Sequence, residues 1–169
     1  SGASERSATC RAARSSLALM RSPVSMRMRQ AYLALDGGLS NRVRIVDASS
    51  ATLTIKSRKA GVRRLEFEFP IPLPDAEALL LLRQGAVIEK VRHILPWHGL
   101  RWEIDVFEGE NAGLVIAEIE LENERQHFEA PEWLGAEITG QERYYNGSLA
   151  RQPFCTWAPQ TGPVAEPTG

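Results

Sequence analysis

The feature that most constrains this chain is a set of paired like charges, each pair placed at positions i and i+2 of a short apolar segment. Three pairs are basic, three are acidic and none mixes the signs: Arg42/Arg44, Lys56/Arg58, Lys90/Arg92, Glu66/Glu68, Glu103/Asp105 and Glu118/Glu120. Side chains alternate between the faces of a β-strand, so each pair predicts a strand with one charged and one apolar face. A solvated face usually mixes the signs, and this sorting therefore indicates a shared charged space. For residues 102–121 taken alone, an ordinary hairpin with a solvated polar face is the alternative.

Turn residues between these segments predict an antiparallel meander. Gly, Pro, Asn and Asp separate strands that we expect over 26–35, 41–46, 51–58, 64–69, 88–95, 102–107 and 114–121. A helix is expected over 76–84, with Asp75 as its N-cap. The Thr-x-x-Glu spacing of Thr139 and Glu142 predicts a capping box that opens a second helix over 140–149. The fold class is therefore mainly β (α+β).

Such a sheet could curl with its charged faces inward, as a barrel with a hydrated interior and a few outer helices. Charges in an interior are costly unless they stay hydrated or bind a ligand. Arg and Lys suit phosphate oxygens, and carboxylates suit Mg²⁺ or Mn²⁺. The pattern therefore predicts a polyanion held together with a divalent metal. Hydrolysis of a phosphoanhydride at such a site needs mainly positioning and charge neutralisation.

Composition indicates one domain in a chain of 169 residues, and the formal net charge of −1 gives no reason to expect nucleic acid or an anionic membrane surface as partner. No apolar run approaches the roughly 20 residues of a membrane span, and a cytoplasmic location is the expectation.

Residues 1–25, rich in Arg, Ser and Ala, are expected to be atypical and disordered. The folded domain is expected over 26–150, and the Pro-rich residues 151–169 are expected to be a flexible, dispensable tail.

Several charged fragments occur in an order and spacing that match a known family. They are Arg42-Val-Arg44, Leu53-Thr-Ile-Lys56, Glu66-Phe-Glu68, Lys90-Val-Arg92, Trp102-Glu-Ile-Asp-Val-Phe107, Ala117-Glu-Ile-Glu120 and Glu137-Ile-Thr139 with Arg143-Tyr-Tyr-Asn146. Over about residues 27–150 the chain resembles the CYTH superfamily, the triphosphate tunnel metalloenzymes, and in particular its short bacterial members. The resemblance implies an antiparallel eight-stranded tunnel that cleaves inorganic or organic triphosphates with Mg²⁺ or Mn²⁺.

The resemblance also implies roles for individual residues. Phosphate binding falls to Arg42, Arg44, Lys56 and Arg92, with Lys90 beside them. Metal binding falls to Glu118 and Glu120, supported by Asp105 and Glu103, with Glu66 and Glu68 in the same acidic wall. Tyr32 matches a tyrosine that positions the attacking water, and Lys56 and Glu120 complete the expected catalytic set.

One family motif is not matched. The first strand of the family carries Glu-x-Glu-x-Lys, whereas residues 1–25 contain Glu5 as their one acid. A catalytically impaired module that binds phosphorylated ligands is therefore an alternative to the hydrolase, and an adenylyl cyclase of the same superfamily is another. The expected partner is a triphosphate or polyphosphate small molecule, with no nucleic acid and no membrane, and a homodimer is left open.

Overall fold

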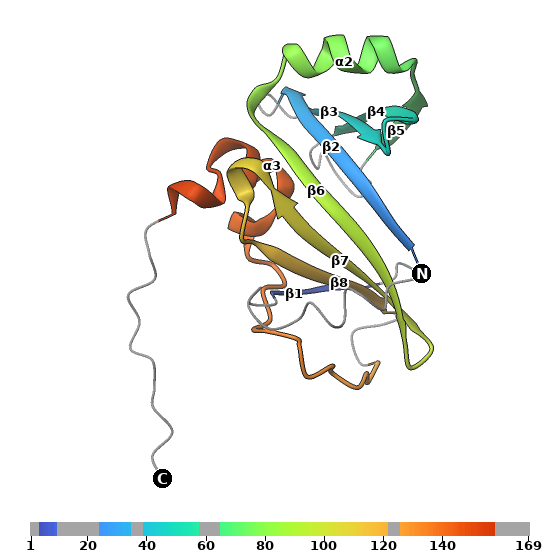
Figure 1. Ribbon diagram of the computed structural model, residues 1–169, viewed down its shortest axis with the longest axis vertical. Helices are drawn as coiled ribbons and strands as arrows, with labels where there is room; N and C mark the ends of the chain where they lie inside the picture. The colour runs from blue at the N-terminus through green and yellow to red at the C-terminus, as the bar shows by residue number, and fades with distance from the viewer. Residues whose placement is uncertain (1–3, 10–23, 35–38, 58–64, 122–125, 158–169) are drawn as a thin grey trace.

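The computed structural model describes residues 4–9, 24–34, 39–57, 65–121 and 126–157, and its main feature is a single antiparallel β-sheet (Figure 1). Eight strands are hydrogen-bonded in the order β1-β8-β7-β6-β2-β3-β4-β5. The expected mainly β, eight-stranded antiparallel architecture is confirmed. The strands are β1 (Ser4–Thr9), β2 (Val24–Ala34), β3 (Leu39–Val46), β4 (Ser50–Ser57), β5 (Glu66–Pro70), β6 (Gln84–Trp97), β7 (Leu100–Glu108) and β8 (Val115–Leu121).

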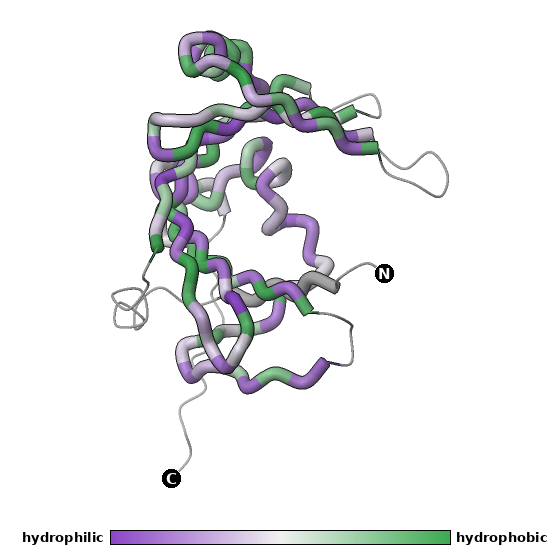
Figure 2. Tube along the Cα trace, turned by 90° about the vertical axis from the view of Figure 1, so that its right-hand side faces the viewer, coloured by the Kyte–Doolittle hydropathy of each residue, from purple (hydrophilic) through white to green (hydrophobic). Residues whose placement is uncertain are grey.

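The sheet is strongly curved but open. Figure 2 shows the end that carries β3, β4 and β5 bent over the end that carries β7, β8 and β1. The register of β2 shifts between Gln30 and Tyr32 against β6, and between Tyr32 and Ala34 against β3. Such irregularities increase local bending. Among the described residues the edge strands β1 and β5 do not pair with each other, so the expected closure into a tunnel is not observed.

The convex face of β2, β3 and β4 is covered by α2 (Leu73–Leu81). Ala76 and Leu80 of this helix pack with Val43, Ile45 and their neighbours, which explains why the apolar side of β3 is buried. The expected bounds differ from those observed, because the helix begins directly after Pro72 and ends before the strand β6. Asp75 lies in the first turn and the N-cap makes no side-chain hydrogen bond. The fixed φ of a proline in the first turn suits such a start.

A second apolar cluster covers the convex face of β7 and β8. Trp102, with 1% of its surface exposed, lies at its centre. The rings of Phe128 and Trp133 contact the Trp102 ring edge-on, with centroids 5.6 and 5.7 Å away. Both convex faces are thus sealed by apolar contacts, and the charged side chains of the same strands lie on the concave face.

The C-terminal part of the chain packs against the concave face at one end of the sheet. It contains η3 (Glu142–Tyr144), α3 (Asn146–Arg151) and η4 (Phe154–Thr156), and the link β7–β8 contains η2 (Gly109–Asn111). The α3 helix approaches β6 so closely that a Cβ at Gly85 would lie 2.2 Å from the backbone oxygen of Ala150. Leu149 and Ala150 join a buried cluster with Ile88 and Phe107.

Two expectations about this segment are wrong. The helix expected over 140–149 is a 3₁₀ turn followed by a six-residue α-helix, and neither N-cap makes the side-chain hydrogen bond that a capping box would supply. The tail expected to be flexible from residue 151 is ordered as far as Trp157, because Phe154 and Trp157 pack on the apolar cluster. The buried Asn111 Oδ1 accepts a hydrogen bond from the Phe154 backbone N–H at 2.8 Å. Residues 158–169 lie outside the described residues.

The N-terminal expectation also needs correction. Residues 4–9 form β1 on the outer side of β8, and β2 already begins at Val24. Pairing with a sheet edge uses backbone groups and does not require alternating apolar side chains. The remaining residues of 1–25 lie outside the described residues. Within the described part of the chain, no helix is both long and apolar enough to cross a membrane.

Candidate active site

Two guanidinium groups of β3 form the basic wall of the concave face. Arg44 Nε donates to Gln30 Oε1 at 3.0 Å, and Arg42 Nη2 donates to Thr54 Oγ1 at 3.3 Å. Gln30 and Thr54 are buried, so their hydrogen bonds hold the two guanidinium groups in place on the sheet. Burial, followed by the like charges of Arg42 and Arg92, lowers the pKa of Arg44 to about 10. Crowded cations of this kind favour a bound anion.

Tyr32 lies beneath these arginines, in the apolar cluster that contains Ile88 and Phe107. Burial raises the pKa of the Tyr32 hydroxyl, although the charges of Arg42 and Arg44 oppose the shift. The phenol therefore stays protonated at neutral pH. A role for Tyr32 in positioning the attacking water stays a prediction.

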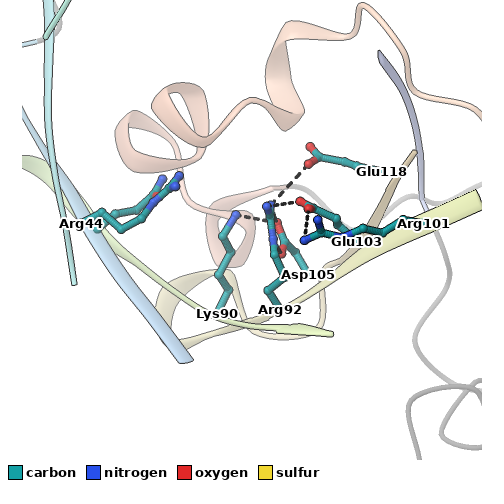
Figure 3. A network of polar contacts seen from close by, with 8 residues as sticks. Arg44, Lys90, Arg92, Arg101, Glu103, Asp105 and Glu118 are labelled. Atoms are coloured by element: carbon teal, nitrogen blue, oxygen red, sulfur yellow. Dashed lines mark hydrogen bonds and ion pairs between the residues drawn. The ribbon is translucent and has the colours of Figure 1, made fainter. Parts of the chain in front are cut away.

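The centre of the concave face is a network around Arg92 (Figure 3). Arg92 Nε and Nη2 donate to the two oxygens of Asp105 at 2.7 and 2.8 Å. Lys90 Nζ donates to Asp105 Oδ2 at 2.5 Å. Arg92 also forms ion pairs with Glu103 and, at 3.4 Å, with Glu118. Cross-strand register explains the arrangement, since Arg92 of β6 lies directly opposite Asp105 of β7.

The charges in this network determine its protonation. Burial alone would lower the pKa of Arg92, but Asp105, Glu103 and Glu118 raise it above its ordinary value. Burial alone would raise the pKa of Asp105, but Lys90 and Arg92 hold it below its ordinary range. Burial lowers the pKa of Lys90, and the carboxylate of Asp105 opposes that shift. Opposite charges in direct contact thus compensate each other at the centre of the network.

Glu118 and Glu120 of β8 form the acidic wall. They lie two residues apart on one strand, and Glu118 is paired in register with Glu103 of β7. On the other side of β8, the register of β1 places Glu5 opposite Glu120 and Ser7 opposite Glu118. The strand β1 thus occupies the position next to the acidic pair, with Ser4-Glu-Arg-Ser-Ala-Thr9 as its sequence.

An open cavity of about 550 Å³ joins the basic and acidic walls. It brings together six of the predicted site residues, namely Arg42, Arg44, Arg92, Glu103, Glu118 and Glu120. The rest of its lining is Gly99, Leu100, Arg101, Ile119, Gln126 and Asn146. Sequence reasoning missed three polar members of this set. Arg101 precedes Glu103 by two residues and could have been found from the strand period. Asn146 ends the fragment Arg143-Tyr-Tyr-Asn146 but received no role of its own, and Gln126 stands in no segment with a strand period.

The predicted residues of β4 and β5 do not line the cavity. Lys56 of β4 forms an ion pair with Glu66 of β5 at 2.8 Å, and Glu68 Oε1 accepts a hydrogen bond from Thr54 at 3.2 Å. None of Lys56, Glu66 and Glu68 lines the cavity. Lys56 and Glu66 are thus paired across the β4–β5 edge, and Glu68 Oε1 lies 3.9 Å from Arg42 Nη2. Arg58, which completes the Lys56 pair in the sequence, lies outside the described residues.

The carboxylates of the concave face determine whether a divalent metal fits this site. Among the described residues, no three Asp, Glu, His or Cys side chains converge. Both oxygens of Asp105 are engaged by Lys90 and Arg92. Glu118 and Glu120 are left as the two carboxylates of β8 that line the cavity. Such a pair fits Mg²⁺, which is typically bound by one or two carboxylates, water and the phosphates of its substrate.

Comparison with known proteins places this geometry in a family. Residues 13–153 match the CYTH domain family. The chain belongs to the CYTH family. This CYTH chain is 44% identical over 127 residues to an inorganic triphosphatase of Acetivibrio thermocellus, covering 75% of this chain and 81% of the relative. It is 37% identical over 102 residues to an inorganic triphosphatase of Nitrosomonas europaea, covering 58% and 66%.

Solved structures agree with the family assignment. A crystal structure of an inorganic triphosphatase matches the CYTH chain with a TM-score of 0.71 at 27% identity, covering 89% of this chain and 95% of the other. A Hippeastrum protein, described as adenylyl cyclase-like with a dominant triphosphatase activity, matches with a TM-score of 0.54 at 17% identity, covering 72% and 80%. The second match shows a shared fold alone.

Proposed function

We propose that this CYTH protein is a metal-dependent phosphoanhydride hydrolase that cleaves inorganic triphosphate into diphosphate and phosphate. The observation that carries the proposal is one cavity with Arg42, Arg44 and Arg92 on one side and Glu118 and Glu120 on the other. The two relatives named inorganic triphosphatase, at 44% and 37% identity, support the same reaction.

The arginines would bind the phosphate chain. Arg42 and Arg44 offer guanidinium donors that are fixed from below by Thr54 and Gln30. Charge-assisted hydrogen bonds from such prearranged donors strengthen binding and cost little reorganisation. Burial, followed by repulsion from Arg42 and Arg92, lowers the pKa of Arg44 to about 10, and an anion between the arginines would relieve that repulsion. Arg92 lines the same cavity from β6 and would supply a third guanidinium to the phosphate chain.

The carboxylates of β8 would hold the metal. CYTH triphosphatases are metal-dependent in general, and we infer Mg²⁺ or Mn²⁺ held by Glu118 and Glu120. The bound ion would neutralise negative charge on the phosphates. The protein's own contribution is to orient the chain between the two walls. The cavity, of about 550 Å³, would accommodate a triphosphate with water.

A second candidate is a module that binds phosphorylated ligands without turnover. It is favoured by β1, which lies beside Glu118 and Glu120 and carries one acid and no lysine. The adenylyl cyclase alternative requires a site for a nucleotide base. None of the cavity-lining residues in the described part of the chain is aromatic, so no stacking surface supports it.

Phosphate release from inorganic triphosphate tests the proposal. We expect release with Mg²⁺ or Mn²⁺, none with EDTA, and a much slower reaction with ATP. Calorimetry on the same preparation measures triphosphate binding. Tight binding without phosphate release under any metal condition would refute the hydrolase and favour the binding module. Formation of cyclic AMP from ATP would favour the cyclase.

A further inference from the structure

We propose that Lys90 and Asp105 are a buried positioning pair that holds Arg92 in its phosphate-binding orientation, and that neither side chain contacts substrate or metal. The inference rests on the proposed function for the role of Arg92. It departs from the roles that the family resemblance implies, namely phosphate binding for Lys90 and metal binding for Asp105.

Burial separates the pair from the cavity. The side chains of Lys90 and Asp105 are 1% and 3% exposed, and neither belongs to the cavity lining among the described residues. The side chain of Arg92 is 16% exposed and does line the cavity. A ligand in the cavity therefore meets Arg92, while the pair lies behind it (Figure 3).

The hydrogen bonds define what the pair does. Asp105 accepts from Arg92 Nε at 2.7 Å and from Arg92 Nη2 at 2.8 Å, which is the two-pronged contact that fixes the plane of a guanidinium. Lys90 Nζ binds the Asp105 Oδ2 at 2.5 Å. Because the ammonium holds one carboxylate oxygen, the carboxylate cannot rotate freely. The orientation of Arg92 is thus set by Asp105, and that of Asp105 by Lys90.

The surroundings leave Lys90 little freedom to act elsewhere. Lys90 lies directly opposite Phe107 in the sheet register, and its ammonium lies 5.4 Å from the centroid of that ring. Phe107 belongs to the apolar cluster closed by α3. A buried ammonium beside an apolar cluster is stabilised by the carboxylate that it contacts. If the ammonium moved away, both groups would be buried charges without a partner. Asp105 likewise has both oxygens occupied by cations, which leaves poor access for a metal.

A double-mutant cycle separates positioning from direct contact. The variants are Lys90→Met, Asp105→Asn and their combination, each made in the wild-type and in the Arg92→Met background. Binding of inorganic triphosphate is measured by calorimetry in EDTA, so that no turnover occurs, and binding of Mn²⁺ alone is measured by electron paramagnetic resonance. Arg29→Met and Glu77→Gln serve as matched controls, because these residues form an exposed ion pair at 2.8 Å on the outer surface.

A positioning role predicts a loss that depends on Arg92. With Arg92 present, we expect Lys90→Met/Asp105→Asn to weaken triphosphate binding at least about tenfold, in line with losing one oriented charged donor. In the Arg92→Met background the same change should weaken binding by less than about threefold, since coupled residues are non-additive. Mn²⁺ affinity should stay within about twofold in every variant of the pair. Lys90→Met/Asp105→Asn removes both charges of the buried pair, so neither is left without its partner. If a single variant does not fold, the comparison is made with this double variant.

Three results would overturn the inference. Unchanged triphosphate affinity in Lys90→Met/Asp105→Asn would show that the pair does not position Arg92. A tenfold loss that persists without Arg92 would make Lys90 a direct phosphate ligand, and a tenfold loss of Mn²⁺ affinity in Asp105→Asn would make Asp105 a metal ligand. Absence of phosphate release by the wild type would refute the proposed function alone, because the binding cycle needs no turnover.

Discussion

Replacing Arg44 by Met should separate ligand binding from stability. The side chain is charged at pH 7 in both folded and unfolded chains, but burial and the neighbouring cations lower its folded pKa to about 10. A cation with a lowered folded pKa destabilises the fold at every pH below that value, and the cost fades only at higher pH. For Arg44 the cost is on the order of 1–3 kcal/mol. Methionine removes it while keeping the length of the side chain.

One lost contact opposes this gain. Arg44 Nε is the donor to Oε1 of Gln30, which is fully buried. Leaving that acceptor without its partner costs about 1–3 kcal/mol. We therefore expect the free energy of unfolding of Arg44→Met to lie within about 1 kcal/mol of the wild type. In Arg44→Met/Gln30→Leu the buried amide is also removed, and this double variant should be more stable than Arg44→Met by about 1–2 kcal/mol.

Triphosphate affinity, unlike stability, should fall clearly in Arg44→Met. Arg44 supplies a charged donor to the cavity, and its removal should cost about 1.5–3 kcal/mol, or roughly 10–150-fold in the Kd for inorganic triphosphate. Urea unfolding gives the stability and calorimetry in EDTA gives the Kd, with Arg29→Met on the outer face as control. A loss of stability above about 2 kcal/mol in the double variant, or an unchanged Kd, would refute the view of Arg44 as a cation held in place for an anion.

Further predictions concern the acidic wall, the C-terminal cluster and acid stability. Glu118→Gln/Glu120→Gln should abolish phosphate release and weaken Mn²⁺ binding measured by electron paramagnetic resonance. Its free energy of unfolding should change by no more than about 1 kcal/mol. Full Mn²⁺ affinity in this variant would exclude Glu118 and Glu120 as metal ligands. Trp157→Ala should lower the free energy of unfolding in urea by about 2–4 kcal/mol. The centroid of the Trp157 ring lies 5.0 Å from that of Phe154 and 3.8 Å from Arg143 Cζ. A change below about 1 kcal/mol would support a dispensable tail. Since the pKa of Asp105 is lowered in the fold, its contribution should be complete above about pH 4 and lost as pH falls through the folded value, and Asp105→Asn should flatten that part of the pH–stability profile.

The strands could be predicted from sequence because a period of two is a local property. Val43 and Ile45 are buried under α2, while Arg42 and Arg44 line the cavity, as alternation requires. Curvature and register are not local, however, and they decide which charged faces meet. Both residues of the β3 and β8 pairs line the cavity, but only Arg92 of the β6 pair and Glu103 of the β7 pair do so. Lys56 at the β4–β5 edge is neutralised by Glu66 directly opposite it.

Register also determines which carboxylates remain for a metal. Six acidic residues share the same type of spacing, and nothing in that spacing distinguishes Asp105 from Glu118. In the folded sheet Asp105 lies opposite Arg92 and accepts from two cations, while Glu118 lies opposite Glu103 and touches Arg92 at 3.4 Å. Asp105 therefore compensates the cations of β6, whereas Glu118 and Glu120 line the cavity, where a ligand can reach them. We therefore propose that β8 supplies the carboxylates for the divalent ion.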